Sequence, residues 1–312
     1  MCQVTVAFCT LAENVFFLMR PVETIENFII ADTNLIDPSK NQIIHGNTMK
    51  VIHSLPDKSY TSCITSPPYW GIRDYGTNHQ IGAESYLDDF IKNLVLIFRV
   101  IREKLKDDGT LWLNLGDSYT SGNRKWRAQD KKNPGRAMSY RPATPEGLKS
   151  KDLIGVPWKV AFALQNDGWY LRSDIVWHKP NCQPESVRDR PTQSHEYVFL
   201  LSKSEKYYYD YEAIREATKK PGVKRNRRTV WSVNTESFKG AHFATFPLGL
   251  IMPMIEAASK ENELILDPFF GAGTLGVACL NLNRRFHGIE ISDEYVALSQ
   301  DRINDFQNGR LF

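Results

Sequence analysis

The chain has few cysteines and no pair of them at a metal-binding spacing. Its 312 residues include five cysteines, and none forms a C-x-x-C pair. An odd, scattered set of thiols argues against a disulfide framework and against a zinc site, and it is typical of a reducing cytosol. The five are Cys2, Cys9, Cys63, Cys182 and Cys279.

A long hydrophobic run is also missing. The apolar stretch over residues 1–19 has no basic beginning and is interrupted by Glu13 and Asn14. It fits neither a signal peptide nor a membrane span. We therefore expect an added helix or strand there, or a true start at Met19, and a cytoplasmic protein with no membrane partner.

An excess of charge of one sign is lacking overall, since the formal net charge is only +3. The basic residues are nevertheless clustered. Residues 219–228 read KKPGVKRNRR, with six basic residues and no acidic one, and residues 122–151 are also rich in Lys and Arg. Such clusters indicate a face for a polyanion, although a solvated loop without a ligand explains a charge run about equally well.

From residue 41 the chain alternates between strand and helix patterns. Residues 60–68 and 110–119 are apolar strand candidates, and Leu87, Phe90 and Leu94 begin a helical period that we expect Gly109 to stop. This alternation predicts a mainly parallel sheet with helices on its faces.

Polar segments interrupt this alternation. Gly, Pro, Ser and basic residues dominate 118–151, where we expect a long mobile loop. A helix and a strand follow up to Pro180, and residues 196–210 (EYVFLLSKSEKYYYD) are expected to form a hairpin. We find no internal repeat and no low-complexity tract.

The run TSPPYW at residues 65–70 ends a strand candidate on two consecutive prolines. Proline has no N–H for a sheet ladder and a fixed backbone angle, so the pair ends the strand and stiffens the turn. A rigid turn at a strand end is where binding sites occur in α/β sheets.

A second candidate site is ELILDPFFGAGT at residues 263–274, where Asp267 and two glycines lie between a strand and a helix. Glu290 follows about 20 residues later at the next strand end, where an acid can accept hydrogen bonds from ribose hydroxyls. The chain has no Gly-Lys-Ser/Thr phosphate loop, and Leu275 replaces the third glycine of a dinucleotide site. A ribose-bearing cofactor without a pyrophosphate, such as S-adenosylmethionine, fits best.

Together these motifs resemble the amino-group DNA methyltransferases of bacteria and phages, in the permuted (beta) group whose S/D-P-P-Y/F motif precedes the cofactor motif. The resemblance covers residues 42–300 and rests, in order, on TSPPYW, TLWLNLGDSY, IVWHKPN, HFATFP and DPFFGAGT followed by GIE. It implies an α/β, Rossmann-like methyltransferase fold: a mainly parallel twisted sheet with helices on both faces, a circularly permuted motif order and an inserted target-recognition region.

The resemblance also implies a division of the chain into four parts. These are an N-terminal extension (1–40), a catalytic half with a basic loop (41–181, loop 118–151), a target-recognition region (182–240) and a cofactor-binding half (241–312).

S-adenosyl-L-methionine is the cofactor that the resemblance implies. At the position of Asn47, this family often has an acidic residue that reaches the adenine, so this chain differs from the family there. The resemblance implies that the methionine end and the sugar are held by Asp267, Phe269, Phe270, Gly271, Gly273 and Thr274, and that Glu290 binds the ribose. It implies that the segment closing over the cofactor contains His242, Phe243, Thr245 and Pro247, and that Asn47 approaches the adenine.

The exocyclic amine of a base is a poor nucleophile, because its lone pair is delocalised into the ring. In an S-P-P-Y turn, the Ser66 hydroxyl and the Pro67 carbonyl can accept the two amine hydrogens and direct the lone pair toward the methyl donor. Pro68 keeps the turn rigid and Tyr69 stacks on the base, which must first be flipped out of the duplex.

Double-stranded DNA is therefore the expected partner. We expect the basic segments to hold phosphates and the target-recognition region to read bases. The candidate DNA-contacting residues are Trp70, which packing in the core explains equally well, and Arg124, Lys125, Arg127, Lys219, Lys220, Lys224, Arg225, Arg227 and Arg228.

The sequence leaves several interpretations of the substrate and the activity open. Ser66 at the head of the motif favours N4 of cytosine over N6 of adenine within this family. An RNA or protein-glutamine N-methyltransferase is disfavoured because N-P-P-Y is more usual there, and a binding module without chemistry is disfavoured by two intact motifs. Cys182, preceded by Asn181, is a poor match to the Pro-Cys nucleophile of carbon-5 enzymes. A companion restriction endonuclease would be a further partner.

Overall fold

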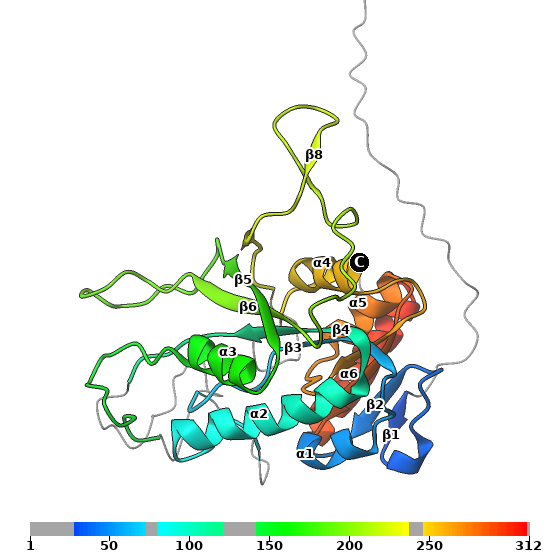
Figure 1. The fold of residues 1–312 in the computed structure, drawn as a ribbon, viewed down its shortest axis with the longest axis horizontal. Helices are drawn as coiled ribbons and strands as arrows, with labels where there is room; N and C mark the ends of the chain where they lie inside the picture. Colours follow the sequence, from blue (N-terminus) through cyan, green and yellow to red (C-terminus); the bar gives the residue numbers. More distant parts are fainter. Residues whose placement is uncertain (1–27, 73–79, 121–141, 237–245, 311–312) are drawn as a thin grey trace, which may run out of the picture.

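A nine-stranded sheet runs through the computed structural model, which describes residues 28–72, 80–120, 142–236 and 246–310 (Figure 1). In order of neighbours, the strands are β1 (Ile29–Ile30), β2 (Gln42–His45), β11 (Arg285–Glu290), β10 (Leu264–Asp267), β3 (Tyr60–Thr65), β4 (Leu105–Leu115), β6 (His195–Ser202), β5 (Tyr170–His178) and β9 (Val230–Ser232). Neighbours from β1 to β4 are parallel, β6 is antiparallel to both β4 and β5, and β9 is parallel to β5.

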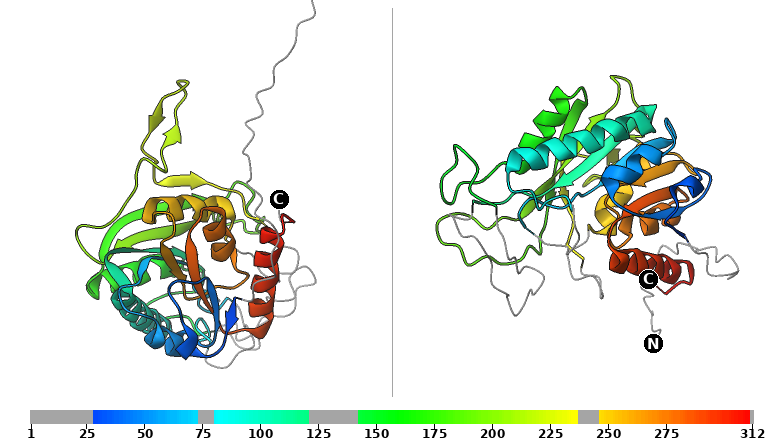
Figure 2. Two further views of the ribbon diagram at one scale, coloured as in Figure 1. Left: turned by 90° about the vertical axis from the view of Figure 1, so that its right-hand side faces the viewer. Right: turned by 90° about the horizontal axis from the view of Figure 1, so that it is seen from below.

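Helices cover both faces of this sheet, as the alternation of patterns predicts (Figures 1 and 2). The first three pack into one core and the last three into the other. They are α1 (Thr48–Val51), α2 (Leu87–Lys104) and α3 (Val156–Asn166) on one face, and α4 (Leu248–Ala258), α5 (Thr274–Asn281) and α6 (Asp293–Gln307) on the other. Short 3-10 turns are η1 (Thr33–Leu35) and η2 (Ile52–Ser54). None of the described helices is long and apolar enough to cross a membrane.

The central strands β3 and β4 are mostly buried because both faces of the sheet are covered. In β4, Leu111 and Leu113 point into the core under α2 and α3, whereas Trp112 between them points into the core under α4. Successive side chains of a strand point to opposite faces, so one run of hydrophobic residues supplies both cores.

The end of helix α2 differs from the prediction that Gly109 stops it. The helix ends at Lys104, and β4 begins directly at Leu105. Gly109 lies inside the strand, where the pairing with β3 shifts register between Tyr60 and Ser62. A Cβ at this glycine would lie 3.1 Å from the Thr61 carbonyl oxygen, so the glycine permits close approach of two strands instead of stopping a helix.

The hairpin predicted over residues 196–210 is wrong. Only the first part forms a strand, β6, and its partners are β4 and β5. The tyrosine-rich segment that follows packs as a loop, with Tyr209 stacked on Trp112 at 6.3 Å between ring centroids. Long-range pairing therefore replaces the local pairing that the sequence indicated.

The segments around the sheet contain further described structure. Residues 28–40, predicted as part of an extension, supply β1 at the sheet edge. The base of the predicted basic loop is closed by a bridge between Tyr119 and Leu153 and by the Asp117 carboxylate, which accepts hydrogen bonds from the backbone N–H of Gly155 and Val156. Residues 121–141 lie outside the described residues.

The predicted target-recognition region, 182–240, is interleaved with the sheet. It supplies β6 and β9, whereas β7 (Glu216–Ala217) and β8 (Lys224–Arg225) form a separate antiparallel hairpin. Figure 2 shows this β7–β8 hairpin projecting from the body of the molecule. The projecting part is therefore shorter than the predicted region.

Candidate active site

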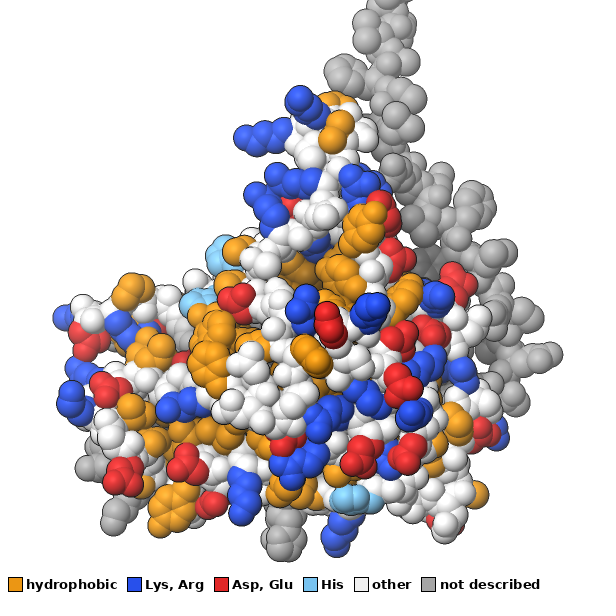
Figure 3. Space-filling model, viewed as in Figure 1, with side chains coloured by type: hydrophobic (Ala, Val, Ile, Leu, Met, Phe, Trp, Pro, Cys, Tyr) orange, Lys and Arg blue, Asp and Glu red, His pale blue; other side chains and the backbone are white. Residues whose placement is uncertain are grey.

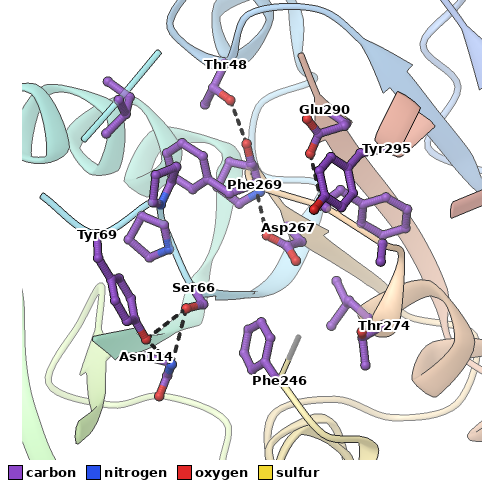
Figure 4. Close-up of a pocket in the computed structure, with 18 of the residues that line it drawn as sticks. Thr48, Ser66, Tyr69, Asn114, Phe246, Asp267, Phe269, Thr274, Glu290 and Tyr295 are labelled. Carbon is purple, nitrogen blue, oxygen red and sulfur yellow. Dashed lines mark hydrogen bonds between the residues drawn. The ribbon is translucent and has the colours of Figure 1, made fainter. Parts of the chain in front are cut away.

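One pocket lies at the edge of the sheet where the parallel strands end (Figure 4). The carboxyl ends of β3, β4, β10 and β11 meet there because these strands are parallel. Strand β6 runs in the opposite direction and β5 is antiparallel to it, so the start of β6 and the end of β5 reach the same edge. This topology brings together residues that are far apart in the sequence, such as Thr65 and Asp267, which are separated by 202 positions.

The S-P-P-Y turn forms one wall of the pocket. Ser66, Pro67, Pro68 and Tyr69 all line it. The Ser66 Oγ lies 3.5 Å from the Tyr69 Oη, and both oxygens lie near the Asn114 amide, whose Nδ2 is 3.2 Å from Ser66 and 2.9 Å from Tyr69 (Figure 4). The turn is thus held by hydrogen bonds as well as by its prolines.

Next to Tyr69, an ion pair that the sequence did not indicate also lines the pocket. The Tyr69 Oη donates to the Glu196 Oε2 at 2.7 Å, and the Asn114 Nδ2 lies 3.0 Å from the same oxygen. The Lys179 Nζ donates to the Glu196 Oε1. The Glu196 and Lys179 side chains are only 15% and 17% exposed, so both charges are largely withdrawn from water.

A second wall, beside the turn, holds the Asp267 carboxylate. The side chain is buried and accepts hydrogen bonds from the Thr65 hydroxyl at 2.6 Å and from the Phe269 N–H at 3.0 Å. Burial raises the pKa of Asp267 to about 7, and the charge of nearby Glu290 acts in the same direction. Among the described residues, no cationic side chain forms an ion pair with Asp267, so the site suits a ligand that brings a positive charge, as the ammonium group of S-adenosylmethionine would.

The glycine turn and Glu290 complete this wall. Glu290 accepts three backbone hydrogen bonds, from Gly271, Ile291 and Ser292, at 2.7 to 2.9 Å. Burial raises the pKa of Glu290, whereas these N–H groups and the charge of His45 act in the opposite direction. One lone pair on Oε2 remains for a ligand hydroxyl. Gly271 has φ of 52° and nothing within 4 Å of an added Cβ, so its backbone is open to the pocket.

Phe270 supports the turn from below. It is 3% exposed and stacks on Phe286 with ring centroids 5.5 Å apart. Its ring also lies over Gly288, where an added Cβ would come within 2.2 Å of it. Phe269 and Phe270 both line the pocket, but Phe270 is chiefly a packing residue.

The helix that follows the turn is braced from α6. Gly273 has φ of 73° and is the N-cap of α5. The buried Arg302 donates to the Thr274 hydroxyl at 2.7 Å and to the Ala272 carbonyl at 3.2 Å. Burial lowers the pKa of this guanidinium to about 10. Thr274 lines the pocket, whereas Arg302 holds the turn from behind.

Asn47 lines the pocket and has a structural function that the sequence did not indicate. It is the N-cap of α1, and its side chain accepts a hydrogen bond from the Met49 N–H. The neighbouring Thr48 hydroxyl donates to the Pro268 carbonyl at 2.6 Å, which ties this helix to the glycine turn. Both residues line the pocket.

Several predicted residues lie elsewhere or cannot be placed. Trp70, predicted to contact DNA, is 5% exposed and donates its indole N–H to the Glu84 carbonyl, so it belongs to the core and the prediction is corrected. Pro247 is the N-cap of α4, and its neighbour Phe246 lines the pocket. The predicted residues outside the described part of the chain are His242, Phe243, Thr245, Arg124, Lys125 and Arg127.

The basic residues of 219–228 surround the β7–β8 hairpin, where Figure 3 shows Lys and Arg side chains gathered. They are not equivalent. Arg225 and Arg228 both pair with Glu216, and Arg227 lies over the Trp231 ring at 4.4 Å. Lys219, Lys220 and Lys224 are exposed.

Other pocket residues had only weak signals in the sequence. Asn114 and Glu196 are polar residues within apolar strands, which is a sign of a functional or paired group. Trp177 lies at the end of β5 with its ring 4.2 Å from the Lys179 ammonium, and Tyr295 comes from the start of α6. Cys182 is not among the residues that line this pocket.

Comparison with known proteins gives concordant matches. The model of a family described as DNA methylase matches residues 61–301. The Type II methyltransferase M.SmaI of Serratia marcescens is 60% identical over 263 residues, which cover 84% of this chain and 90% of that protein. The Type II methyltransferase M.Cfr9I of Citrobacter freundii is 60% identical over 261 residues, covering 84% and 87%.

Solved structures match the fold. The PvuII DNA methyltransferase, described as cytosine-N4-specific, superposes with a TM-score of 0.63 at 19% identity and covers 87% of this chain and 93% of its own. The complex of M1.HpyAVI with S-adenosylmethionine gives a TM-score of 0.55 at 20% identity, with 84% and 98% covered. The α/β fold with a mainly parallel sheet is therefore that of S-adenosylmethionine-dependent DNA methyltransferases.

Proposed function

The chain belongs to the DNA methylase family, whose members use S-adenosylmethionine, and from this premise we propose that it methylates the exocyclic N4 of cytosine in duplex DNA. The observation that carries the choice of base is Ser66, a hydroxyl at the head of the P-P-Y turn and on the wall of the pocket. The PvuII enzyme, described as cytosine-N4-specific, has the same fold. N6 of adenine is the alternative.

The two walls of the pocket suit two functions, cofactor binding and orientation of the target base. Asp267 offers an anion to the ammonium of the bound cofactor, and Glu290 offers an acceptor to its ribose. The cofactor supplies an electrophilic methyl group. Ser66 and the Pro67 carbonyl accept the amine hydrogens of the flipped base, Tyr69 covers the ring, and the rigid turn keeps these acceptors in place.

We assign DNA contact to the exposed hairpin lysines and to the basic residues of 118–151, and base readout to the part of 182–240 that lies outside the sheet. The four-part division of the chain remains our working description of these functions. A companion restriction endonuclease that cleaves the same site, and action in the cytoplasm, complete the proposal for a Type II enzyme.

The experiment is incubation of the purified protein with unmethylated genomic DNA and labelled S-adenosylmethionine, followed by nuclease digestion and mass spectrometry of the nucleosides. We expect N4-methylcytosine. We also expect Ser66→Ala to lower the rate of methyl transfer roughly 100-fold, because one acceptor of the developing charge is lost. N6-methyladenine as the product would overturn the choice of base and keep the site.

A further inference from the structure

The hydrogen bonds around Ser66 have a direction, and that direction is set by Glu196. An ionised carboxylate only accepts hydrogen bonds. The Tyr69 hydroxyl, 2.7 Å from the Glu196 Oε2, must therefore donate to it, so the Tyr69 oxygen acts as an acceptor toward Asn114 and Ser66. The Ser66 hydroxyl, 3.5 Å from that oxygen, can then direct its own hydrogen toward Tyr69.

Asn114 is oriented by the same carboxylate. Its Nδ2 lies 3.0 Å from the Glu196 Oε2, so the reverse orientation would place the amide oxygen against a carboxylate oxygen. With one N–H of Nδ2 directed at Glu196, the other is shared between the Tyr69 Oη at 2.9 Å and the Ser66 Oγ at 3.2 Å. The Ser66 hydroxyl thus donates its hydrogen bond to Tyr69, accepts one from Asn114 and keeps one lone pair directed at the pocket.

Lys179 gives the half-buried Glu196 carboxylate a charge partner. It donates to the second carboxylate oxygen, Oε1, and leaves Oε2 to Tyr69 and Asn114. The ion pair spans the end of β5 and the start of β6, two strands that lie next to each other. The carboxylate is therefore fixed by the sheet and not by a loop.

We propose that Glu196 is a positioning residue that acts through Tyr69 to keep Ser66 an acceptor and then receives the proton that the reaction releases. This proposal rests on the Ser66 assignment made under Proposed function, and it applies to either base. After transfer, the methylated amine carries one proton too many. That proton moves to the Ser66 Oγ, the Ser66 proton moves to the Tyr69 Oη, and the Tyr69 proton moves to the Glu196 Oε2. The nitrogen becomes neutral, Glu196 becomes a carboxylic acid, and it returns the proton to water after the product leaves.

The test uses the full chain with Tyr69→Phe, Glu196→Gln and the double variant. Phenylalanine keeps the ring over the base and leaves the Lys179 pair intact, so it remains informative if Glu196→Gln fails to fold. The exposed Glu103 on α2 provides the matched control, Glu103→Gln. Single-turnover methyl transfer to unmethylated genomic DNA, dissociation constants for cofactor and DNA, and thermal unfolding are measured for each.

Each single variant is expected to slow methyl transfer roughly 100-fold with unchanged dissociation constants, as for loss of a proton acceptor. The double variant is expected to be no slower than the slower single, because both break one chain of hydrogen bonds. Two single effects that multiply, a wild-type rate in Tyr69→Phe, or rates that fall only because cofactor or DNA binds more weakly would overturn the proposal. If Ser66→Ala keeps the wild-type rate, the Ser66 assignment itself fails, which is a separate outcome.

Discussion

At the scale of single residues, Asp267 is a carboxylate held in a place where its charge is unfavourable. Burial raises its pKa from 3.8 to about 7, and the hydrogen bonds from Thr65 and Phe269 only partly offset this. A protonated carboxyl provides no charge for the cofactor's ammonium group. Binding of the cofactor must then release a proton whenever the free protein holds one.

The affinity for S-adenosylmethionine is therefore expected to rise with pH up to about 7 and to level off above it. One pH unit below the pKa, the loss is about tenfold. For the free protein, protonation of Asp267 stabilises the fold fully below pH 3.8, and this stabilisation is lost as the pH rises through about 7. Calorimetric titration at pH 6 and pH 8 measures the affinity.

The control for this titration is Asp267→Asn, which is expected to bind weakly at both values. A pH dependence that persists in that variant would belong to another group, for which Glu290 is the nearest candidate. Equal wild-type affinities at pH 6 and pH 8 would contradict the expectation.

Gly288 lies under a ring and has no room for a side chain. A Cβ there would come within 2.2 Å of Phe270, which is itself stacked on Phe286. We expect Gly288→Ala to lower the free energy of unfolding by about 1 to 3 kcal/mol, as for other overpacked cores, and to weaken cofactor binding. Urea denaturation measures the first effect, with Gly249→Ala, whose nearest neighbour would be 3.4 Å away, as the tolerant comparison.

The sequence identified some residues of the pocket better than others. Ser66 and Tyr69 follow strand β3, Asp267 and Glu290 are the last residues of β10 and β11, and all four were found by motif and spacing. Glu196 was not found, because its partners lie in β4 and in the segments that follow β3 and β5, and its motif, HEY, resembles any strand start. A single sequence does not indicate which polar residues of separate strands will meet.

At the scale of elements, the β7–β8 hairpin offers a direct test of DNA contact. Lys219 and Lys220 are exposed, whereas Arg225 is already paired with Glu216. We expect Lys219→Gln with Lys220→Gln to weaken DNA binding about equally for all sequences, and to reduce the slope of log affinity against log salt by about 2. Binding measured at several salt concentrations gives the slope, and an unchanged slope would remove the hairpin from the DNA interface.

Elements were predicted well where the hydrophobic period was long and poorly where tertiary contacts decided. The period of α2 identified the helix, yet its end at Lys104 was missed, because Gly109 serves the approach of two strands. The predicted hairpin at 196–210 failed for a related reason. Strand β6 pairs with β4 and β5, and no local sequence pattern predicts which strands will pair with it.

At the scale of the whole molecule, the two sequence halves are one folding unit. Strand β3 of the first half lies between β4 and β10, and β10 belongs to the second half. We therefore expect a single unfolding transition. Tryptophan fluorescence can monitor it on both sides of the sheet, because Trp112 and Trp169 lie in different cores. Two separate transitions would contradict the expectation of one folding unit.

A ligand of the cofactor site is expected to stabilise this unit. S-adenosylhomocysteine at 100 times its dissociation constant is expected to add about 2.7 kcal/mol to the free energy of unfolding.

The order of strands also decides when the enzyme becomes active during its synthesis. A ribosome delivers the strand before the S-P-P-Y turn about 200 residues before its sheet neighbour β10, which is Leu264–Asp267. Until then β3 lacks a partner on one side, and the cofactor has no binding site. We therefore expect a nascent chain that ends before β10 to be unable to methylate DNA.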